Sequence, residues 1–342
     1  MLQSSRPMAG QRAANVAVVG ATGAVGAELI DCLQRRGFPL ASLQLLASER
    51  SAGRRMGEHV VEAVSIDAFE DVDVAFFSAG AGVSRAYAPL AAAQGALVVD
   101  NSSAFRMDPN IALVVPEVNG QDLPAGPGIV ANPNCVTAVS VMALGPLRAL
   151  GRMVRVIGAT YQSASGAGAA AMEELTASTA AHLAGEAFTP QVLPHPYAFN
   201  LFSHNAAVDP QSGYNGEEDK VMAEHRKILG LPDLRISFTC VRVPVLRAHS
   251  MALSIEFDRP VCADQARAIL SAAPGVRVVD DRAGNHFPMP LEASGEDDVL
   301  VGRLRQDLSD PDGRTLALFL SGDQLLRGAA LNAVLIAERL WR

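Results

Sequence analysis

The feature that most constrains the fold of this chain lies near its amino end, where an apolar run, a glycine-rich turn and an amphipathic segment follow one another. Residues 16–19 are small or β-branched, glycines stand at 20, 23 and 26, and apolar positions with helical spacing continue to residue 36. A strand that leads through such a turn into a helix presents backbone N–H groups that bind phosphate, which is typical of a dinucleotide-binding domain. The glycine spacing is GxxGxxG and not GxGxxG, so the turn alone is weak evidence. The residues expected at this phosphate site are Gly20, Thr22, Gly23, Ala24, Val25 and Gly26.

The following residues strengthen this interpretation because apolar runs and helix-like segments alternate. Further apolar runs occupy residues 43–47, 72–77, 96–99, 111–115 and 129–131, and helix-like segments such as 83–94 separate several of them. Repeated strand–helix units predict a parallel sheet with helices on both faces. We therefore expect an α/β fold that begins with a Rossmann-type, doubly wound parallel sheet.

Beyond residue 150 the alternation is lost. Longer β-like runs appear at 153–162, 234–245, 251–257 and 316–320, which predicts a second, α+β domain with a mixed or antiparallel sheet. The apolar segment 325–340 has helical spacing that would let it pack on the first domain. We predict a nucleotide-binding domain over residues 1–133, completed by 324–342, and a catalytic domain over 134–323.

The proline-rich stretch 185–211 holds too many turn residues for regular structure. An ordered loop of this length often forms a subunit contact or covers an active site.

Charge and cysteine usage exclude several classes of protein. The net charge is −8 and no block of Lys or Arg is present, which argues against nucleic-acid binding. No apolar run approaches the ~18 residues of a membrane span, and residues 1–14 lack the apolar core of a signal peptide. We expect a cytoplasmic protein with a short disordered amino-terminal tail. The cysteines at 32, 135, 240 and 262 have no metal-ligand spacing, so we expect no structural metal and a reducing compartment.

The stretch Asn132-Pro133-Asn134-Cys135 lies between the apolar run 129–131 and a helix expected over 138–150. A cysteine where a strand ends and a helix begins is close to free N–H groups and the positive end of the helix dipole, which favour a thiolate. Cys135 is therefore a candidate nucleophile. The alternative is a small buried core residue, which is what most free cysteines are.

The segment that follows the apolar run 43–47 helps to distinguish NAD from NADP as the cofactor. An acidic residue there would hold the ribose of NAD, whereas Arg and hydroxyl groups suit the 2′-phosphate of NADP. Both readings have a candidate, since Glu49 stands beside Ser48, Arg50 and Ser51. The hydroxyls and arginines favour NADP, unless this is only a solvated basic turn.

Two other turns are candidates for a close approach to the cofactor. One follows the apolar run 72–77, and the other precedes a helix expected from residue 169, where it could equally be a simple helix entry. Their candidate residues are Ser78, Ala79 and Gly80 in the first turn, and Ser165 and Gly166 in the second.

Other polar residues remain ambiguous on pattern alone. Arg106 lies in a polar loop after an apolar run, where it could bind an anionic substrate or simply lie on the surface. The acidic residues of 217–219 could merely complement a helix start. None of the seven histidines is singled out by its spacing.

Taken together, the motifs resemble those of the bacterial aspartate-β-semialdehyde dehydrogenase family, in the same order and over almost the whole chain. The matching segments are 20–26, 47–53, 100–103, 115–119, 132–135, 161–168, 240–244 with His249, 287–290 and 301–303. The resemblance implies a homodimer and a catalytic domain that also dimerises. It also implies NADPH-dependent reductive dephosphorylation of L-β-aspartyl phosphate to L-aspartate 4-semialdehyde, a step toward lysine, methionine, threonine and diaminopimelate.

The resemblance further assigns roles to individual residues. It implies that Cys135 is the nucleophile, His249 the acid/base and Gln162 the residue that orients the acyl group. It implies that Arg242 binds the substrate carboxylate and that Glu217 binds its ammonium group. The remaining implied contacts are Arg106 and Lys220 with phosphate, Asn134 with substrate and Asn332 with nicotinamide.

One residue departs from the family pattern. Val136 stands where the family often has a hydroxyl residue, which bears on the pKa of Cys135.

Two other functions deserve comparison. A related reductase of N-acetylglutamyl phosphate would use the same chemistry, but its substrate offers no ammonium for Glu217. A non-catalytic NADP-binding regulator could share the fold, because fold alone does not decide function.

Overall fold

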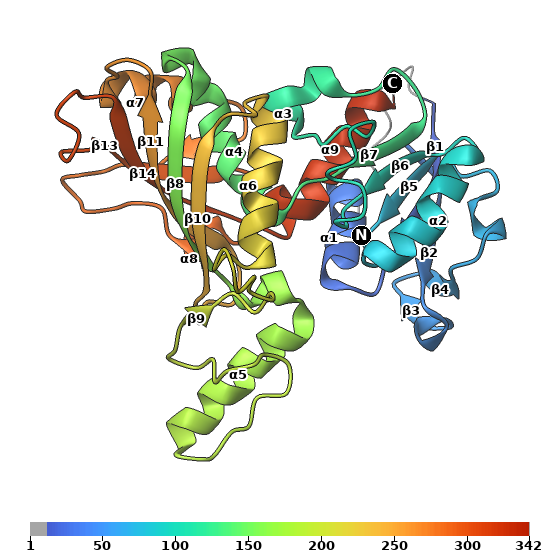
Figure 1. Ribbon diagram of the computed structural model, residues 1–342. Helices are drawn as coiled ribbons and strands as arrows, with labels where there is room; N and C mark the ends of the chain where they lie inside the picture. Colours follow the sequence, from blue (N-terminus) through green and yellow to red (C-terminus); the bar gives the residue numbers. More distant parts are fainter. Residues whose placement is uncertain (1–11, 342) are drawn as a thin grey trace. The chain divides into compact units, whose positions relative to one another are not determined.

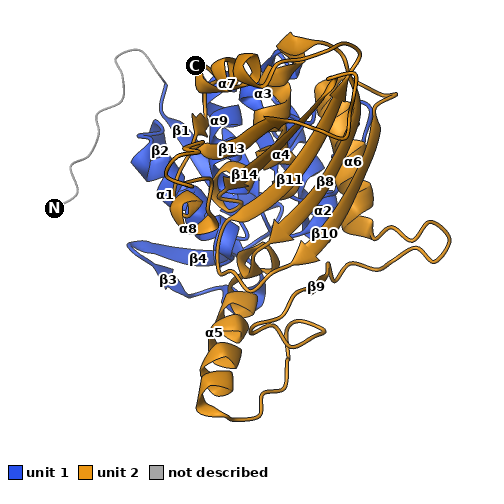
Figure 2. Cartoon of the chain, turned by 90° about the vertical axis from the view of Figure 1, so that its left-hand side faces the viewer, with its two compact units in different colours: residues 1–134, 329–342 blue, residues 135–328 orange. Residues whose placement is uncertain are grey.

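The computed structural model describes residues 12–341. Residues 1–11, which make up most of the expected tail, lie outside the described residues, as does Arg342. The chain forms two compact units, one from 1–134 with 329–342 and the other from 135–328 (Figures 1 and 2). None of the described helices combines the length and apolar character needed to cross a membrane.

Within the described residues, the first unit holds a seven-stranded sheet in the order β3-β4-β2-β1-β5-β6-β7. All neighbouring pairs are parallel except the β3–β4 hairpin, which was not predicted. Figure 1 shows α1 and α9 on one side of this sheet and α2 on the other, as right-handed crossovers require. The strands are β1 Ala14–Val19, β2 Leu40–Ala47, β3 Arg55–Met56, β4 His59–Ala63, β5 Val74–Phe77, β6 Leu97–Asp100 and β7 Gly128–Ala131. The helices are α1 Ala24–Arg35, α2 Ala81–Ala93, α3 Pro116–Asn119 and α9 Leu331–Leu340.

The apolar run 111–115 is not a strand, contrary to expectation. Only Leu113 forms a single parallel bridge, with Ala131. The run is nevertheless buried from residue 113 to residue 115, and Pro116 begins α3 directly after it. Burial explains the apolar character, and the proline ends the extended segment before a ladder can form.

Within the described residues, the second unit holds a seven-stranded mixed sheet in the order β12-β13-β14-β11-β8-β10-β9. Helix α4 contacts α6 and α7, and all three contact this sheet, whereas the opposite face turns toward the viewer in Figure 2. The predicted fold class, a doubly wound parallel sheet followed by an α+β domain with a mixed sheet, is confirmed. The strands are β8 Met153–Gln162, β9 Phe202–Ser203, β10 Arg235–Arg242, β11 His249–Phe257, β12 Val276–Val278, β13 Val299–Gln306 and β14 Thr315–Gly322. The helices are α4 Cys135–Leu147, α5 Ala169–Ala184, α6 Gly216–Leu229, α7 Ala263–Ser271 and α8 Pro290–Ala293, and a π-helical turn spans Leu326–Ala330.

The proline-rich stretch 185–211 is irregular apart from β9, as predicted. The carboxylate of Glu174 on α5 accepts three successive backbone N–H groups, those of Gln191, Val192 and Leu193, at 2.5, 2.7 and 2.9 Å. The Tyr197 hydroxyl donates to the carbonyl of Val243 at 2.7 Å, just beyond the end of β10. These bonds give the loop a defined path without a ladder.

Candidate active site

Three of the predicted site residues lie at one edge of the second sheet. β8 ends at Gln162 and β10 ends at Arg242, and these two residues are partners in the parallel register. β11 runs antiparallel to β8 and begins at His249. The carboxyl ends of two strands and the amino end of a third therefore meet, and the sheet places these three side chains together.

Cys135 reaches the same edge from the first residue of α4. Its Sγ lies 3.5 Å from Nε2 of His249. The helix was predicted to begin at Ala138, but it begins at Cys135. The sulfur therefore lies at the positive end of the α4 dipole, which stabilises a thiolate. The side chain of Val136, next along the helix, is fully buried and apolar.

His249 and Arg242 are buried and close together. Burial holds the pKa of His249 well below its ordinary value, and the charges of Arg242 and His204 act in the same direction. The imidazole is therefore neutral at physiological pH. Arg242 donates to the carbonyl of Ser163 at 3.2 Å and contacts Nε2 of His204 at 2.9 Å. No carboxylate in the described part of the chain forms an ion pair with Arg242, so its buried charge favours an anionic ligand.

His204, which follows β9, was not singled out by the sequence. Burial lowers its pKa to about 4, with a raising effect from Glu217 and lowering effects from Arg242 and Lys220. The charges of Glu217 and Lys220 on α6 therefore act on the same histidine as the charge of Arg242 at the end of β10. No pattern in the sequence distinguishes His204 from the other histidines.

The two residues on α6 form a pair of their own. Lys220 Nζ lies 3.3 Å from Oε2 of Glu217, which is buried while the lysine is partly exposed. Capping had been the simpler explanation for the acidic residues, but the capping box is made by Asn215 and Glu218. Capping therefore accounts for the side chain of Glu218 but not for that of Glu217.

Gln162 and Gly166 show features that packing does not require. The buried Nε2 of Gln162 has no hydrogen-bond partner among the described residues, although such a group is costly to leave unpaired. A Cβ on Gly166 would lie 2.8 Å from Cε1 of His249 and 2.9 Å from Nη1 of Arg242. The structure thus places Gly166, predicted as a cofactor contact, directly against His249 and Arg242.

In the first unit, the glycine turn packs tightly against the turn that follows β5. Gly20 has φ +88°, and a Cβ there would lie 2.7 Å from the backbone of Ser78. A Cβ on Gly26 would lie 2.3 Å from the carbonyl oxygen of Gly20. No side chain caps the start of α1 at Gly23. This cradle of glycines and uncapped N–H groups fits a pyrophosphate. The structure places Gly20 against Ser78 and Ala79, and Gly80 follows at the start of α2. The other predicted residues of the glycine turn, Thr22, Gly23, Ala24, Val25 and Gly26, follow Gly20 into the start of α1.

The segment that is predicted to discriminate between NAD and NADP forms a short 3₁₀ turn, Glu49–Ser51, after β2. Ser48, Glu49 and Arg50 are exposed and Ser51 is buried. β2 is the neighbour of β1 in the sheet, and the N–H of Gly20 donates to the carbonyl of Leu46 at 2.8 Å. The turn therefore borders the glycine cradle.

The remaining predicted residues of the first unit surround the loop that leads to Cys135. Arg106 Nε donates to the carbonyl of Asn132 at 2.9 Å. Asn332 donates to the carbonyl of Val114 at 2.9 Å and to Oδ1 of Asn132 at 2.6 Å. The Oδ1 atom of Asn332 is buried without a partner in the described residues. Asn134 is buried in the same loop.

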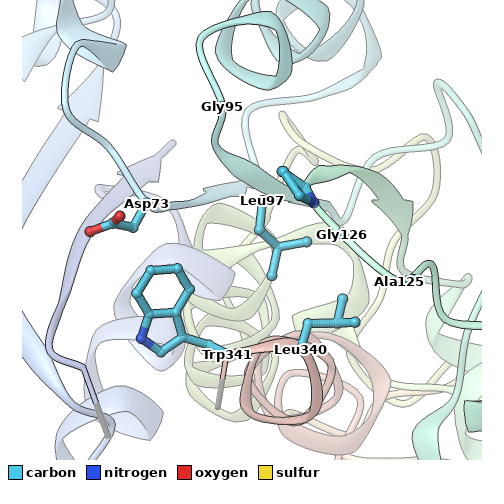
Figure 3. A pocket seen from close by; sticks show the side chains of 8 residues that line it. Asp73, Gly95, Leu97, Ala125, Gly126, Leu340 and Trp341 are labelled. Atoms are coloured by element: carbon cyan, nitrogen blue, oxygen red, sulfur yellow. The ribbon is translucent and has the colours of Figure 1, made fainter.

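A separate pocket of about 150 Å³ lies in the first unit near Trp341 (Figure 3). Asp73 and Leu97 line it just before β5 and at the first residue of β6, so it lies at the amino edge of the sheet. The glycine cradle is at the carboxyl edge, and none of the predicted site residues lines this pocket. Among residues 12–341 there is also no cluster of His, Cys, Asp or Glu that could hold a metal ion.

Two family models match the chain. The first, described as "Semialdehyde dehydrogenase, NAD binding domain", matches residues 15–125, and the second, "Semialdehyde dehydrogenase, dimerisation domain", matches residues 144–327. The first unit thus contains a domain of the NAD-binding type, and its glycine cradle is consistent with that match.

Full-length relatives agree with the models. An aspartate-semialdehyde dehydrogenase of Synechocystis sp. is 51% identical over 329 residues, which cover 95% of this chain and 96% of the relative. One of Bacillus subtilis is 44% identical over 341 residues, covering 96% and 98%. The crystal structure of aspartate semialdehyde dehydrogenase II complexed with ASA from Vibrio cholerae matches with a TM-score of 0.90 and 39% identity, over 96% of this chain and 98% of that one. These matches confirm the resemblance inferred from the motifs, and the chain belongs to the aspartate-semialdehyde dehydrogenase family of oxidoreductases.

Proposed function

We propose that this chain reduces L-β-aspartyl phosphate to L-aspartate 4-semialdehyde, with release of phosphate, NADPH as the cofactor and Cys135 as the acyl carrier. The observation that carries the proposal is the 3.5 Å approach of Cys135 Sγ to His249 Nε2 beside the buried guanidinium of Arg242. The reaction would serve lysine, methionine, threonine and diaminopimelate synthesis in the cytoplasm. Small molecules are the substrates, and neither nucleic acid nor membrane takes part.

The proposed mechanism passes through a thioester because hydride does not readily displace phosphate directly. The thiolate of Cys135 attacks the acyl carbon, and phosphate leaves with the electrons of the broken C–O bond. When bound, the cofactor supplies a hydride to that carbon. The resulting hemithioacetal oxyanion collapses, the C–S bond breaks, and Cys135 is restored as a thiolate. His249 is the acid/base residue and lies beside the sulfur.

The substrate carries several charges, and the second unit offers a partner for most of them. Arg242 binds the α-carboxylate, which a guanidinium can hold through two parallel bonds. Glu217 binds the α-ammonium, and Nε2 of Gln162, which has no partner within residues 12–341, donates to the acyl oxygen. Lys220 binds the phosphoryl group. In the first unit, Arg106 is the second phosphate ligand and Asn134 a further substrate contact.

The cofactor assignment rests mainly on the glycine cradle and the turn after β2. The cradle would hold the pyrophosphate, and Ser48, Arg50 and Ser51 would hold the 2′-phosphate. The buried Oδ1 of Asn332 would accept from the nicotinamide carboxamide. Ser165 and Gly166 are proposed as further contacts from the second unit.

An assay with three substrates tests this function. Purified protein is given NADP and phosphate with L-aspartate semialdehyde, with N-acetylglutamate semialdehyde, or with neither. Turnover of the first compound is expected. Turnover of the second compound alone would indicate the related reductase, and binding of NADP without any turnover would indicate a regulator.

The preference for NADP should depend on Arg50. In Arg50→Ala, we expect the ratio of kcat/KM for NADP to that for NAD to fall roughly 10- to 100-fold, because a charged hydrogen bond to the 2′-phosphate is lost. Arg54→Ala, in the same exposed segment, is the matched control. An unchanged ratio in Arg50→Ala would remove Arg50 from the 2′-phosphate site.

The affinity for phosphate should depend on Lys220. In Lys220→Ala, we expect the KM for phosphate to rise by about tenfold, with a smaller change for the semialdehyde, because one charge-assisted contact is lost. Lys227, the other lysine of the chain, lies on the same helix and provides the control Lys227→Ala. An effect confined to the semialdehyde would contradict the assignment.

The homodimer is proposed to form through the face of the second sheet shown in Figure 2. On β8 the side chains of Ile157 and Tyr161 point to this face and are 42% and 38% exposed. A charge buried against a copy of itself is costly, so Ile157→Asp should raise the dimer dissociation constant at least about tenfold. Light scattering over a range of concentrations measures this. Ile66→Asp, half-exposed in the first unit, is the control, and an equally stable Ile157→Asp dimer would refute this surface.

A further inference from the structure

His204, to which the proposed mechanism gives no task, lies beside the buried guanidinium of Arg242. β9 pairs antiparallel with the end of β10, and His204 follows β9 directly. The backbone N–H of His204 donates to the carbonyl of Cys240 at 2.9 Å, which extends this pairing by one residue. The backbone of the two segments therefore fixes the place of the imidazole next to Arg242.

The hydrogen bonds of the ring indicate which of its nitrogens carries the proton. The backbone nitrogen of Ala206 lies 3.1 Å from Nδ1 of His204. A backbone N–H can only donate, so Nδ1 accepts this bond and carries no proton itself. Burial lowers the pKa of His204 to about 4, so the ring is neutral near pH 7 and holds a single proton. That proton is therefore on Nε2.

The Nε2–H group of His204 then faces a second donor instead of an acceptor. Nη2 of Arg242 lies 2.9 Å from Nε2, and a guanidinium nitrogen can only donate. Within residues 12–341 Nη2 has no other hydrogen-bond partner, whereas Nε contacts Oδ1 of Asn205 and Nη1 donates to the carbonyl of Ser163. Two N–H groups that face each other without an acceptor cost free energy, and an oxygen that accepts from both removes this cost.

The charges around this contact favour an anion as the acceptor. No carboxylate of residues 12–341 forms a hydrogen bond or an ion pair with the ring or the guanidinium, and Glu217, whose charge acts on the ring, pairs with Lys220 at 3.3 Å. The positive charge of Arg242 thus remains available beside the N–H of a neutral imidazole. We propose that His204 is a second ligand of the substrate α-carboxylate, with Nε2–H donating to an oxygen that also accepts from Nη2 of Arg242.

This inference rests on the proposed function, in which Arg242 binds the α-carboxylate, and it adds a residue that determines specificity. A neutral N–H contributes a directed hydrogen bond without a second positive charge. A substrate that lacks the carboxylate leaves the two N–H groups facing each other, and a site with unpaired donors rejects such an analogue strongly. His204 therefore selects for the carboxylate and takes no part in binding phosphate.

The tautomer can be measured by ¹⁵N NMR of histidine-labelled, ligand-free protein, with the His204 signals assigned by their loss in His204→Gln. We expect Nε2 protonated and Nδ1 unprotonated at about pH 7.5. L-Aspartate semialdehyde, added to saturation without NADP or phosphate, should move the Nε2–H proton downfield because a carboxylate then accepts from it. A proton on Nδ1 of the free protein would overturn the proposal, because the ring would then accept from Arg242 and only hold the guanidinium in place. An Nε2–H signal that does not move at saturation would overturn it as well.

Two variants of His204 separate a hydrogen bond from simple packing. In His204→Leu we expect the KM for L-aspartate semialdehyde to rise about tenfold or more, because a hydrogen bond to a charged oxygen is lost. The KM for phosphate should change less than about twofold, since no phosphate contact is removed. His204→Gln carries an amide N–H at a similar reach to Nε2 and should keep the KM for semialdehyde within about threefold of wild type. An equal loss in both variants, or an equal rise in the KM for phosphate, would refute the role.

A control variant and the wild-type protein complete the experiment. His59→Leu replaces a histidine of the first unit that is also partly buried, and it should leave both KM values unchanged. Turnover of semialdehyde by the wild type tests the proposed function, whereas the comparison of the His204 variants tests this inference. The NMR measurement needs no turnover, so it can refute the carboxylate contact while the substrate assay succeeds, and it can support the contact where the assay fails.

Discussion

Replacing Cys135 with serine is expected to lower kcat by about 10⁴-fold or more in both reaction directions. A serine hydroxyl remains protonated near neutral pH and is a far weaker nucleophile than a thiolate, so the acyl group finds no effective acceptor. The fold should be unaffected, since sulfur is exchanged for oxygen at a half-buried position at the start of α4. NADP affinity, measured by fluorescence titration, should also be unchanged.

Cys262→Ser is the matched control, because Cys262 is a free, exposed cysteine just before α7. Cys240 should be inert for a different reason, since burial raises the pKa of its thiol to about 12. Mass spectrometry of protein incubated with semialdehyde and NADP, without phosphate, should detect an acyl adduct on Cys135 alone. Retention of substantial activity by Cys135→Ser, or an adduct on another cysteine, would contradict the assignment.

Gly166→Ala is expected to lower kcat/KM by roughly 10²-fold or more, although it adds only one methyl group. The new Cβ would lie within 2.9 Å of both the ring of His249 and the guanidinium of Arg242, so at least one of them must move. The hydrogen bond to Cys135 and the carboxylate contact would then be misaligned together. The loss should exceed what any accompanying fall in melting temperature explains.

Gly126→Ala provides the comparison for Gly166→Ala. A Cβ at Gly126 meets nothing within 4 Å and its backbone needs no positive φ, so activity and stability should stay close to wild type. Steady-state kinetics with aspartate semialdehyde and phosphate separates the two variants. Wild-type kcat/KM in Gly166→Ala would mean that neither His249 nor Arg242 requires the position seen in the structure.

The hydrophobic periodicity of the sequence predicted helices and strands correctly where one face of the element is buried. The strand expected over 153–162 is β8 with the same limits, and the helix expected from residue 169 is α5. The predicted start of α4 was three residues too late, because Val136 and Thr137 are poor helix formers in isolation. Both are fully buried, and packing outweighs their propensity.

The candidate site was predictable to a lesser degree. A cysteine at a strand–helix junction and a glycine turn after a strand carry a local signal, whereas Arg242 and His249 were assigned only through the family resemblance. Ser163 carries no signal at all, because its backbone contact with Nδ1 of His249 joins two segments that lie far apart in the chain. The three-dimensional structure is needed to reveal such a contact.

The first unit is completed by α9, a helix that is made only after the whole of the second unit. α9 packs on α1 on the same side of the parallel sheet, Arg36 pairs with Glu338 at 2.6 Å, and Asn332 bonds to Asn132. On the ribosome, a nascent chain that has completed β7 must therefore wait through the synthesis of all of 135–328 before this helix emerges. The second unit is continuous and can finish folding first. The unit whose strands are made first is thus the one that is completed last, and until then its sheet lacks the packing of α9.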